Sequence, residues 1–139
     1  MNRVKLSDVY KTRGAREILY RLLKERIPRV NISHRSLPAF KKHLDFIRKR
    51  PYKAWYLISE KPGSFVGGIY LSKNDEIGIL IFKKHQKKGF GEKAVNLLMK
   101  RHRGVKRFLA NINPANVPSI RFFEGLKFRH IQNTYEYRK

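Results

Sequence analysis

The sequence predicts an α/β fold built on a mixed, twisted and mostly antiparallel sheet with helices on both faces. Three observations lead to this prediction. After a weak first-strand signal the chain shows helical periodicity, continues with strand-like runs joined by short turns, and ends with strand-like and helix-like segments in alternation. A chain of 139 residues fits one domain by size, so we expect residues 1–139 to share a single core.

The N-terminal third is predicted to hold a short strand followed by two helices. Val4 and Leu6 alternate with polar residues, which is a weak strand signal. Apolar residues then recur at helical spacing over residues 15–27, which predicts an amphipathic helix. Ser36 is a candidate N-cap for a second helix that ends before Pro51. The predicted inner face of this second helix consists of Leu37, Phe40, Leu44 and Ile47.

The middle of the chain is predicted to form an antiparallel meander of three strands. Residues 55–58 and 65–71 are rich in apolar and aromatic side chains, and Lys-Pro-Gly at positions 61–63 separates them. A tight turn at residues 73–75 then leads into a third strand over residues 76–82.

Strands and helices are predicted to alternate in the rest of the chain. We expect a helix over residues 89–102, a strand over 108–112, a short helix over 117–126 and a last strand or hairpin over 128–137. The inward face of the first of these helices is predicted to consist of Phe90, Ala94, Leu97 and Leu98.

The charge balance is far from neutral. Lys and Arg total 33 and Asp and Glu total 10, which gives a formal net charge of +23. Such a surface attracts polyanions, including nucleic acid, phosphorylated ligands and acidic membranes. The lack of cysteine excludes disulfides and thiolate metal sites, and no apolar stretch approaches the roughly 20 residues of a membrane-spanning helix. We therefore expect a soluble, cytoplasmic protein without a membrane partner.

The segment between the third predicted strand and the following helix has the properties of an anion-binding loop. Lys87 and Lys88 supply positive charge, and Gly89 and Gly91 let the backbone approach a phosphate without a Cβ in the way. Because the loop opens directly into a helix, free N–H groups and the helix dipole favour a pyrophosphate there. The P-loop ending and the third glycine of a dinucleotide fingerprint are both missing. The alternative is a basic loop whose glycines only serve the turn.

Two segments resemble motifs of the GNAT acetyltransferase superfamily. Residues 86–91, Gln-Lys-Lys-Gly-Phe-Gly, are similar to its Gln/Arg-x-x-Gly-x-Gly/Ala signature. Residues 113–128 are similar to its next motif, roughly Asn-x-x-Ser-Ile-x-x-Tyr-x-x-x-Gly-Phe, at the expected distance. The resemblance covers residues 52–130. Within the superfamily, the chain is most similar to the ribosomal-protein and amino-sugar acetyltransferase branches. It implies a single-domain GNAT-like fold and an enzyme that moves an acetyl group from acetyl-CoA to a primary amine.

The resemblance also implies which residues bind acetyl-CoA. Main-chain amides of residues 86–91 would bind the pyrophosphate, and the edge of the strand before them would pair with the pantetheine arm. The amide of Ile81 would polarise the thioester carbonyl. Asn116 and Ser119 correspond to positions that contact the cofactor or hold the loop, although both could simply cap the short helix. The implied cofactor-binding residues are Ile79, Leu80, Ile81, Gln86, Lys87, Lys88, Gly89, Phe90, Gly91, Asn116 and Ser119.

Two carboxylates, Asp75 and Glu76, lie at the start of the implied cofactor strand, where members of the family often place the general base. Side chains alternate along a strand, so only one of the two can face the cleft, and the resemblance favours Glu76 as the catalytic residue. It would take a proton from the acceptor amine, directly or through water. The family's tyrosine is Phe123 here, so the leaving thiolate would depart unassisted or take a proton from water, Ser119 or a tyrosine such as Tyr135.

Besides Phe123 in place of the family's tyrosine, the motif at residues 113–128 departs from the family pattern at its end. The closing Gly-Phe of the family is Lys127-Phe128 in this chain, and we expect Gly125 to have taken over the turn. The histidines of the chain show no close spacing, such as His-x-x-x-His, that would predict a metal site.

The acceptor amine is left open by the sequence. The +23 charge disfavours cationic polyamines and favours an anionic or nucleic-acid-bound amine, such as an amino-sugar nucleotide or a protein amine. His43, on the second predicted helix, is a candidate acceptor-side residue. Two other functions are open: a basic nucleic-acid-binding protein without catalysis, and an inactive relic of the fold that still binds acetyl-CoA. The family often pairs through edge strands, so an oligomer is compatible with the resemblance.

Overall fold

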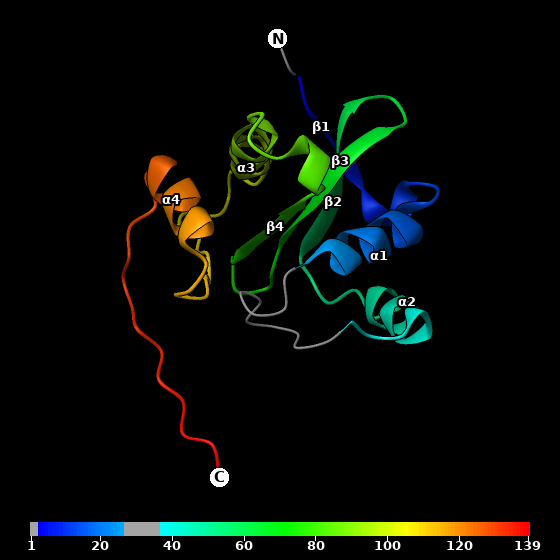
Figure 1. Ribbon diagram of the computed structural model, residues 1–139. Helices are drawn as coiled ribbons and strands as arrows, with labels where there is room; N and C mark the ends of the chain where they lie inside the picture. The colour runs from blue at the N-terminus through cyan, green and yellow to red at the C-terminus, as the bar shows by residue number, and fades with distance from the viewer. Residues whose placement is uncertain (1–2, 27–36) are drawn as a thin grey trace.

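The computed structural model describes residues 3–26 and 37–139, and its centre is a four-stranded sheet (Figure 1). The strands lie in the order β1-β2-β3-β4, and each neighbouring pair is antiparallel. They are β1 (Lys5–Asp8), β2 (Ala54–Lys61), β3 (Ser64–Leu71) and β4 (Ile77–Ile81). The predicted first strand and the predicted three-strand meander are thus both confirmed.

Helices cover both faces of the sheet, as predicted (Figure 1). One face carries α1 (Ala15–Glu25) and α2 (Phe40–Arg48), and the other carries α3 (Phe90–Arg101) and α4 (Val117–Gly125). Short 3-10 turns, η1 (Val9–Lys11) and η3 (Lys83–His85), follow β1 and β4. Position 27, where the first helix was predicted to end, and the predicted N-cap Ser36 lie outside the described residues.

Alternation along the strands divides the core into two layers. One layer joins Ile58 and Ile69 to buried residues of α3 and to Phe123 of α4. The other joins Leu57 to the apolar face of α1 and to Ile47 of α2. Burying each such side chain contributes roughly 1.5–3 kcal/mol, so the sheet is held firmly from both sides.

The buried face of α2 agrees with the prediction at Ile47 and in part at Leu44, and differs from it at Leu37, Phe40 and His43. His43 and Ile47 are buried and Leu44 is half-buried, whereas Leu37 is 46% and Phe40 is 38% exposed. Apolar periodicity did not count the histidine as an inner residue. Its ring takes an inner position because a main-chain carbonyl of α1 satisfies one ring nitrogen.

The C-terminal third departs most from the prediction. The segment 108–112, predicted as a strand, makes a single parallel bridge between Glu76 and Leu109. The prediction of a strand or hairpin over 128–137 is wrong, because this segment runs as an extended tail that pairs with no strand among the described residues (Figure 1). Alternation of side chains forms a strand only where a neighbouring backbone edge supplies hydrogen-bonding partners.

Candidate functional site

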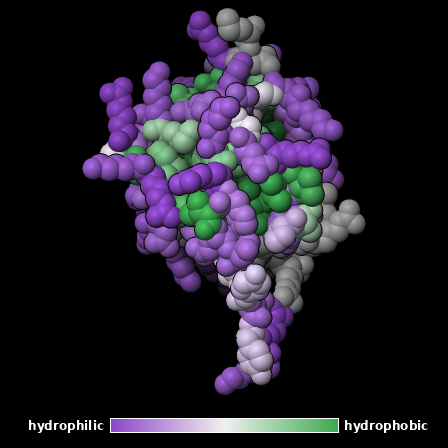
Figure 2. All heavy atoms as spheres, turned by 90° about the vertical axis from the view of Figure 1, so that its left-hand side faces the viewer, coloured by the Kyte–Doolittle hydropathy of each residue, from purple (hydrophilic) through white to green (hydrophobic). Residues whose placement is uncertain are grey.

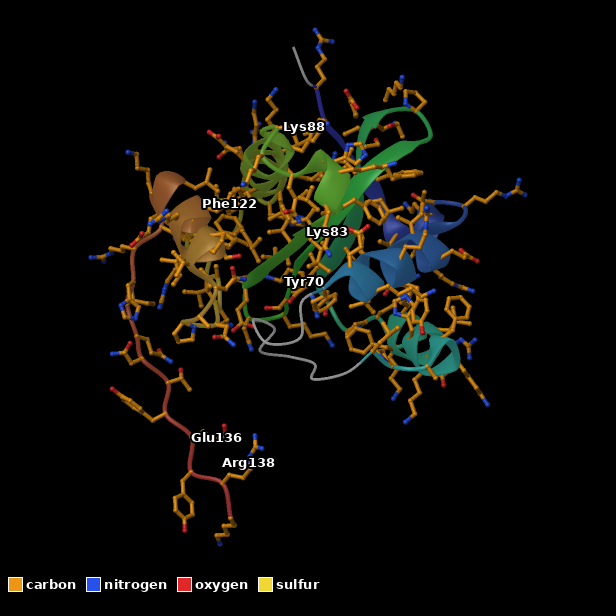
Figure 3. The ribbon with its side chains drawn as sticks, in the orientation of Figure 1. Tyr70, Lys83, Lys88, Phe122, Glu136 and Arg138 are labelled. Carbon is orange, nitrogen blue, oxygen red and sulfur yellow. The ribbon has the colours of Figure 1, made fainter. Side chains whose placement is uncertain are left out.

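The loop between β4 and α3 is the candidate anion-binding site. Lys87 and Gly89 both have positive φ, 62° and 86°, and Gly89 is the N-cap of α3 without a side-chain cap. N–H groups of the first helical turn have no intrahelical acceptor, and the helix dipole adds partial positive charge there. Figure 3 shows Lys83 and Lys88 on this loop. Their charges strengthen a field that already favours an anion.

The two glycines of this loop have different structural roles. A Cβ on Gly89 would meet nothing within 4 Å, so the left-handed backbone conformation and the open space are what this position provides. A Cβ on Gly91 would lie 3.0 Å from Cε1 of Phe122. Gly91 therefore lets α4 pack against the first turn of α3, a contact between the two sequence motifs that their patterns alone did not indicate.

Hydrogen bonds that involve side chains tie the loop to β4 and to α1. The side-chain amide of Gln86 donates from Nε2 to the carbonyl of Ile81 over 3.0 Å. The main-chain N–H of Lys83 donates to Oε1 of Glu25, at the end of α1, over 2.8 Å. The Gln86 side chain thus braces the loop against the end of β4. Glu25 lies far away in the sequence, and no local pattern pointed to it.

One edge of β4 is paired with β3, and the other is paired only at its start. There the N–H of Ile77 donates to the carbonyl of Leu109 over 2.7 Å. Because N–H groups alternate in direction along a strand, those of Ile79 and Ile81 point to the same edge. Beyond the bridge the described residues form no further strand pairing along this edge. An extended ligand arm can pair there as an added strand does.

The side chains of Ile79, Leu80 and Ile81 on β4 are partly buried and pack against the core. Ile79 and Ile81 pack against the layer that contains α3, and Leu80 packs against the layer that contains α1. The main-chain N–H groups of Ile79 and Ile81 are the polar groups that β4 offers to a ligand at its free edge.

The structure places the two candidate carboxylates in different surroundings. Glu76 is half-buried and accepts hydrogen bonds from Ser72 Oγ, over 3.0 Å, and from Asn111 Nδ2. Asp75 has a φ of 64° and forms an ion pair with Lys53. The Glu76 carboxylate is thus fixed in direction by two neutral donors, neither of which the sequence singled out.

A stacked pair of tyrosines lies beside β4. Tyr70, labelled in Figure 3, is paired across the sheet with Gly78. A Cβ on Gly78 would be 2.1 Å from the tyrosine Cζ, so only glycine leaves room for the ring. Tyr52 stacks on Tyr70 with ring centroids 3.7 Å apart and planes 4° apart. Burial is the main cause that raises the pKa of both phenols, and the nearby Glu76 carboxylate adds to the rise for Tyr70. Both hydroxyls are therefore protonated at neutral pH.

A cavity of about 230 Å³ lies between α1, α2 and the sheet. Its lining includes the rings of Phe46, Trp55 and Tyr70, and it reaches β4 at Gly78 and Leu80. The cavity therefore ends at β4, the strand whose free edge is the candidate binding site for an extended ligand arm.

His43, the candidate acceptor-side histidine, lines this cavity. Its Nε2 lies 3.1 Å from the carbonyl of Arg16, and because a carbonyl only accepts, this nitrogen carries the proton. Burial lowers the pKa of His43 more than the hydrogen bond raises it, so the ring is neutral at pH 7.

The N-terminus of α4 is capped by a residue that the sequence singled out. Oδ1 of Asn116 accepts a hydrogen bond from the N–H of Ser119 over 3.3 Å. The capping alternative is therefore realised for the Asn116 side chain. It fixes the start of the helix that carries Phe122 towards Gly91.

The end of α4 corrects one expectation. Gly125 stays within the helix and does not take over the turn; instead Lys127 adopts a φ of 72°. The left-handed residue thus lies at the motif position where the family has glycine. The ring of Phe123 is 6% exposed and packs edge-on against Phe128, with centroids 5.1 Å apart. This ring belongs to the core and has no proton to give.

Hydrophilic side chains cover most of the face on which α4 lies (Figure 2). In the part of the chain that the structure describes, no three His, Asp or Glu side chains gather closely enough to hold a metal ion. No described helix combines the length and the apolar character that crossing a bilayer requires.

Comparison with known proteins identifies similar sequences and folds. The model of the acetyltransferase (GNAT) family matches residues 16–128. A domain from Methanocaldococcus jannaschii superposes with a TM-score of 0.82 at 21% identity, over 96% of this chain and 93% of that one. An acetyltransferase from Thermus thermophilus gives 0.76 at 19% identity, over 94% and 89%. No curated protein matches.

A third similar structure contains bound ligands. The spermidine N-acetyltransferase of Vibrio cholerae, in complex with CoA and spermine, has a TM-score of 0.74 at 16% identity, over 88% of this chain and 78% of that one. Because the sequence identities are this low, the three structures show a similar fold and nothing about the activity of this chain.

Proposed function

The chain belongs to the acetyltransferase (GNAT) family, and on that premise we propose that it transfers an acetyl group from acetyl-CoA to a primary amine. One observation carries the proposal: the free edge of β4 leads directly into the loop whose glycine opens α3. The edge lines up main-chain donors, and the helix N-terminus gathers positive charge. Together they suit an extended amide-containing arm joined to a pyrophosphate, which is the chemistry of coenzyme A.

The described residues fit this co-substrate. First-turn amides of α3 and the charges of Lys83 and Lys87 suit phosphates, while the edge N–H groups of Ile79 and Ile81 suit the carbonyls of an extended arm. Acetyl-CoA supplies a thioester whose carbonyl carbon is open to attack by an amine. The Ile81 N–H is the proposed donor that polarises this carbonyl.

Glu76 is the proposed general base. An amine attacks only when it is unprotonated, so a fixed carboxylate beside the acceptor cavity serves the reaction. Ser72 and Asn111 hold the Glu76 carboxylate, and its charge is felt by Tyr70, whose ring lines the cavity. In this proposal Glu76 takes the amine proton directly or through one water.

The leaving thiolate does not need an acid from α4. Neither Phe122 nor Phe123 carries a proton that it could donate. A thiol with a pKa of about 8.5 is a fair leaving group near neutral pH, so water can protonate the thiolate after it departs.

Acetyl-CoA binding can be tested by thermal unfolding. A ligand at about 100 times its Kd stabilises the folded chain by about 2.7 kcal/mol. We expect acetyl-CoA and CoA to raise Tm even at about 0.5 M salt, where surface charges are screened. Stabilisation that any polyanion reproduces, and that salt abolishes, would instead support the basic nucleic-acid-binding protein that the +23 charge permits.

A pair of glycine variants tests the loop itself. Gly89→Val and Gly104→Val both place a side chain in open space, but only Gly89 has a left-handed φ. We expect Gly89→Val to weaken CoA binding by about tenfold or more because the loop main chain must shift, and Gly104→Val to leave it unchanged. Release of free thiol in the presence of amines then separates an enzyme from an inactive CoA-binding relic of the fold.

A further inference from the structure

The cavity between α1, α2 and β4 has walls suited to a flat apolar group. Trp55 and Tyr52 meet edge to face with centroids 4.8 Å apart, and Phe46 packs edge-on to Tyr52 at 5.8 Å and to Trp55 at 6.1 Å. All three rings line the cavity together with Tyr70. Aromatic side chains arranged in this way bind other rings through offset or edge-to-face contacts.

The charged side chains among the described lining residues of the same cavity are basic. Arg26, at the end of α1, and Lys42, on α2, contribute to the lining, and none of the described lining residues is Asp or Glu. Burial of Arg26 is the main cause that lowers its pKa, while the neighbouring phenols of Tyr52 and Tyr70 oppose the shift. A guanidinium that is partly removed from water gains most from a bound anion, which it can hold with two parallel hydrogen bonds.

We propose that this cavity selects an amine acceptor that carries an aromatic body and an acidic group, with the acidic group held by Arg26. The inference rests on the proposed function, because it names the acceptor class of the same reaction. It separates this chain from the spermidine acetyltransferase of similar fold, whose bound spermine is a polycation. A polyamine would bring positive charge to a cavity that has two cations and no carboxylate among its described lining residues.

Binding can be measured without catalysis, because Trp55 is the only tryptophan of the chain and lies in the cavity wall. Tryptophan fluorescence is titrated with 3-phenylpropionate and with phenethylamine, which share a phenyl ring and differ in the sign of their charge. We expect the wild-type protein to bind the anion at least about tenfold more tightly than the cation. Equal binding of the two, or tighter binding of the cation, would overturn the inference.

Three variants at two arginines, one within α1 and one at its C-cap, make the test specific. Arg26→Gln should remove the preference for 3-phenylpropionate, and Arg26→Lys should restore part of it. Arg21→Gln is the matched control: Arg21 lies on α1, over the ring of Phe82 and outside the cavity lining, so the preference should persist. If Arg26→Gln binds the anion as the wild type does, with an unchanged Tm, Arg26 does not hold the acidic group and the inference is wrong.

Turnover measurements show whether the proposed acceptor class is wrong or the proposed acetyltransferase function is wrong. Thiol release from acetyl-CoA is followed with phenylalanine, phenethylamine and spermidine as acceptors. We expect phenylalanine to have the highest kcat/KM of the three acceptors. Faster turnover of spermidine or phenethylamine would refute the acceptor class and leave the acetyltransferase proposal standing. If no amine releases thiol and CoA does not raise Tm, the proposed function fails, while the fluorescence titration still decides the charge preference.

Discussion

Gly91 lies where α3 and α4 touch, because a Cβ at this position would be 3.0 Å from Cε1 and 3.1 Å from Cζ of Phe122. We therefore predict that Gly91→Ala lowers the free energy of unfolding by about 1–2 kcal/mol through overpacking. Chemical denaturation measures this loss. Phe122→Leu in the same chain should recover part of it, and fully additive losses in the double variant would contradict the predicted clash.

Glu76 and Asp75 are adjacent carboxylates with different partners, which makes each a control for the other. We predict that Glu76→Gln lowers kcat by about 10²-fold or more near neutral pH, because the amine loses its proton acceptor. Asp75→Asn should remove only the ion pair with Lys53, whose side chain is 41% exposed, and should leave kcat close to that of the wild type. Unchanged turnover of Glu76→Gln from about pH 6 to about pH 9 would remove Glu76 from the mechanism.

Lys127 is an L-residue in the left-handed region, at a φ of 72°. This conformation costs about 1–2 kcal/mol, and a glycine there costs about 0.5–1 kcal/mol in extra chain entropy. We predict that Lys127→Gly raises the free energy of unfolding by about 0.5–1 kcal/mol. Lys106→Gly, at an exposed position without positive φ, should lower it instead. Equal effects of the two substitutions on the denaturation midpoint would disprove the strain argument.

At the scale of elements, the sequence predicted what depends on local pattern. Periods of 3.6 and 2 located α1, α3, α4 and the meander because the apolar face of each element can be read from consecutive residues, whatever that face packs against. The segment 108–112 and the tail were predicted as strands from the same alternation, yet one makes a single bridge and the other no pairing within the described part of the chain. Pairing depends on an edge elsewhere, and local alternation carries no information about it.

The candidate site shows the same division between local and distant information. The glycine loop at the start of α3 follows from consecutive residues, so its location could be predicted. The Asn111 bond to Glu76 and the Glu25 bond to the loop join residues far apart in sequence, and only the fold brings them together. The packing of Phe122 on Gly91 likewise depends on how two helices cross the sheet.

The C-terminal tail, residues 130–139, is expected to contribute little to stability. Residues 130–139 are exposed throughout, whereas Phe128 packs against Phe123 of the core. We predict that deleting residues 130–139 changes the free energy of unfolding by less than about 0.5 kcal/mol. Phe128→Ala should cost about 2–3 kcal/mol through the loss of buried contact. A deletion that costs as much as Phe128→Ala in urea unfolding would show that the tail packs on the folded chain.

At the scale of the whole molecule, the charge acts on stability and on association in opposite directions. A net charge of +23 on 139 residues repels itself in the compact state, and few carboxylates are present to offset it. The ion pairs Arg48–Asp45 and Arg138–Glu136 are largely exposed, and exposed pairs of this kind contribute little. The same field draws an anionic ligand towards the loop at the start of α3.

Sodium chloride should therefore separate the two effects. Raising it from about 0.05 M to about 0.5 M shortens the Debye length several-fold, which relieves self-repulsion and weakens steering. We predict a higher free energy of unfolding in urea and an association rate of CoA that falls by about tenfold. The dissociation rate should change little, because the main-chain contacts along β4 and the first turn of α3 are short-range. Stopped-flow fluorescence measures both rates. A CoA dissociation rate that rises as steeply as the association rate falls would mean that the phosphates are held by diffuse surface charge and not by the amides of this loop.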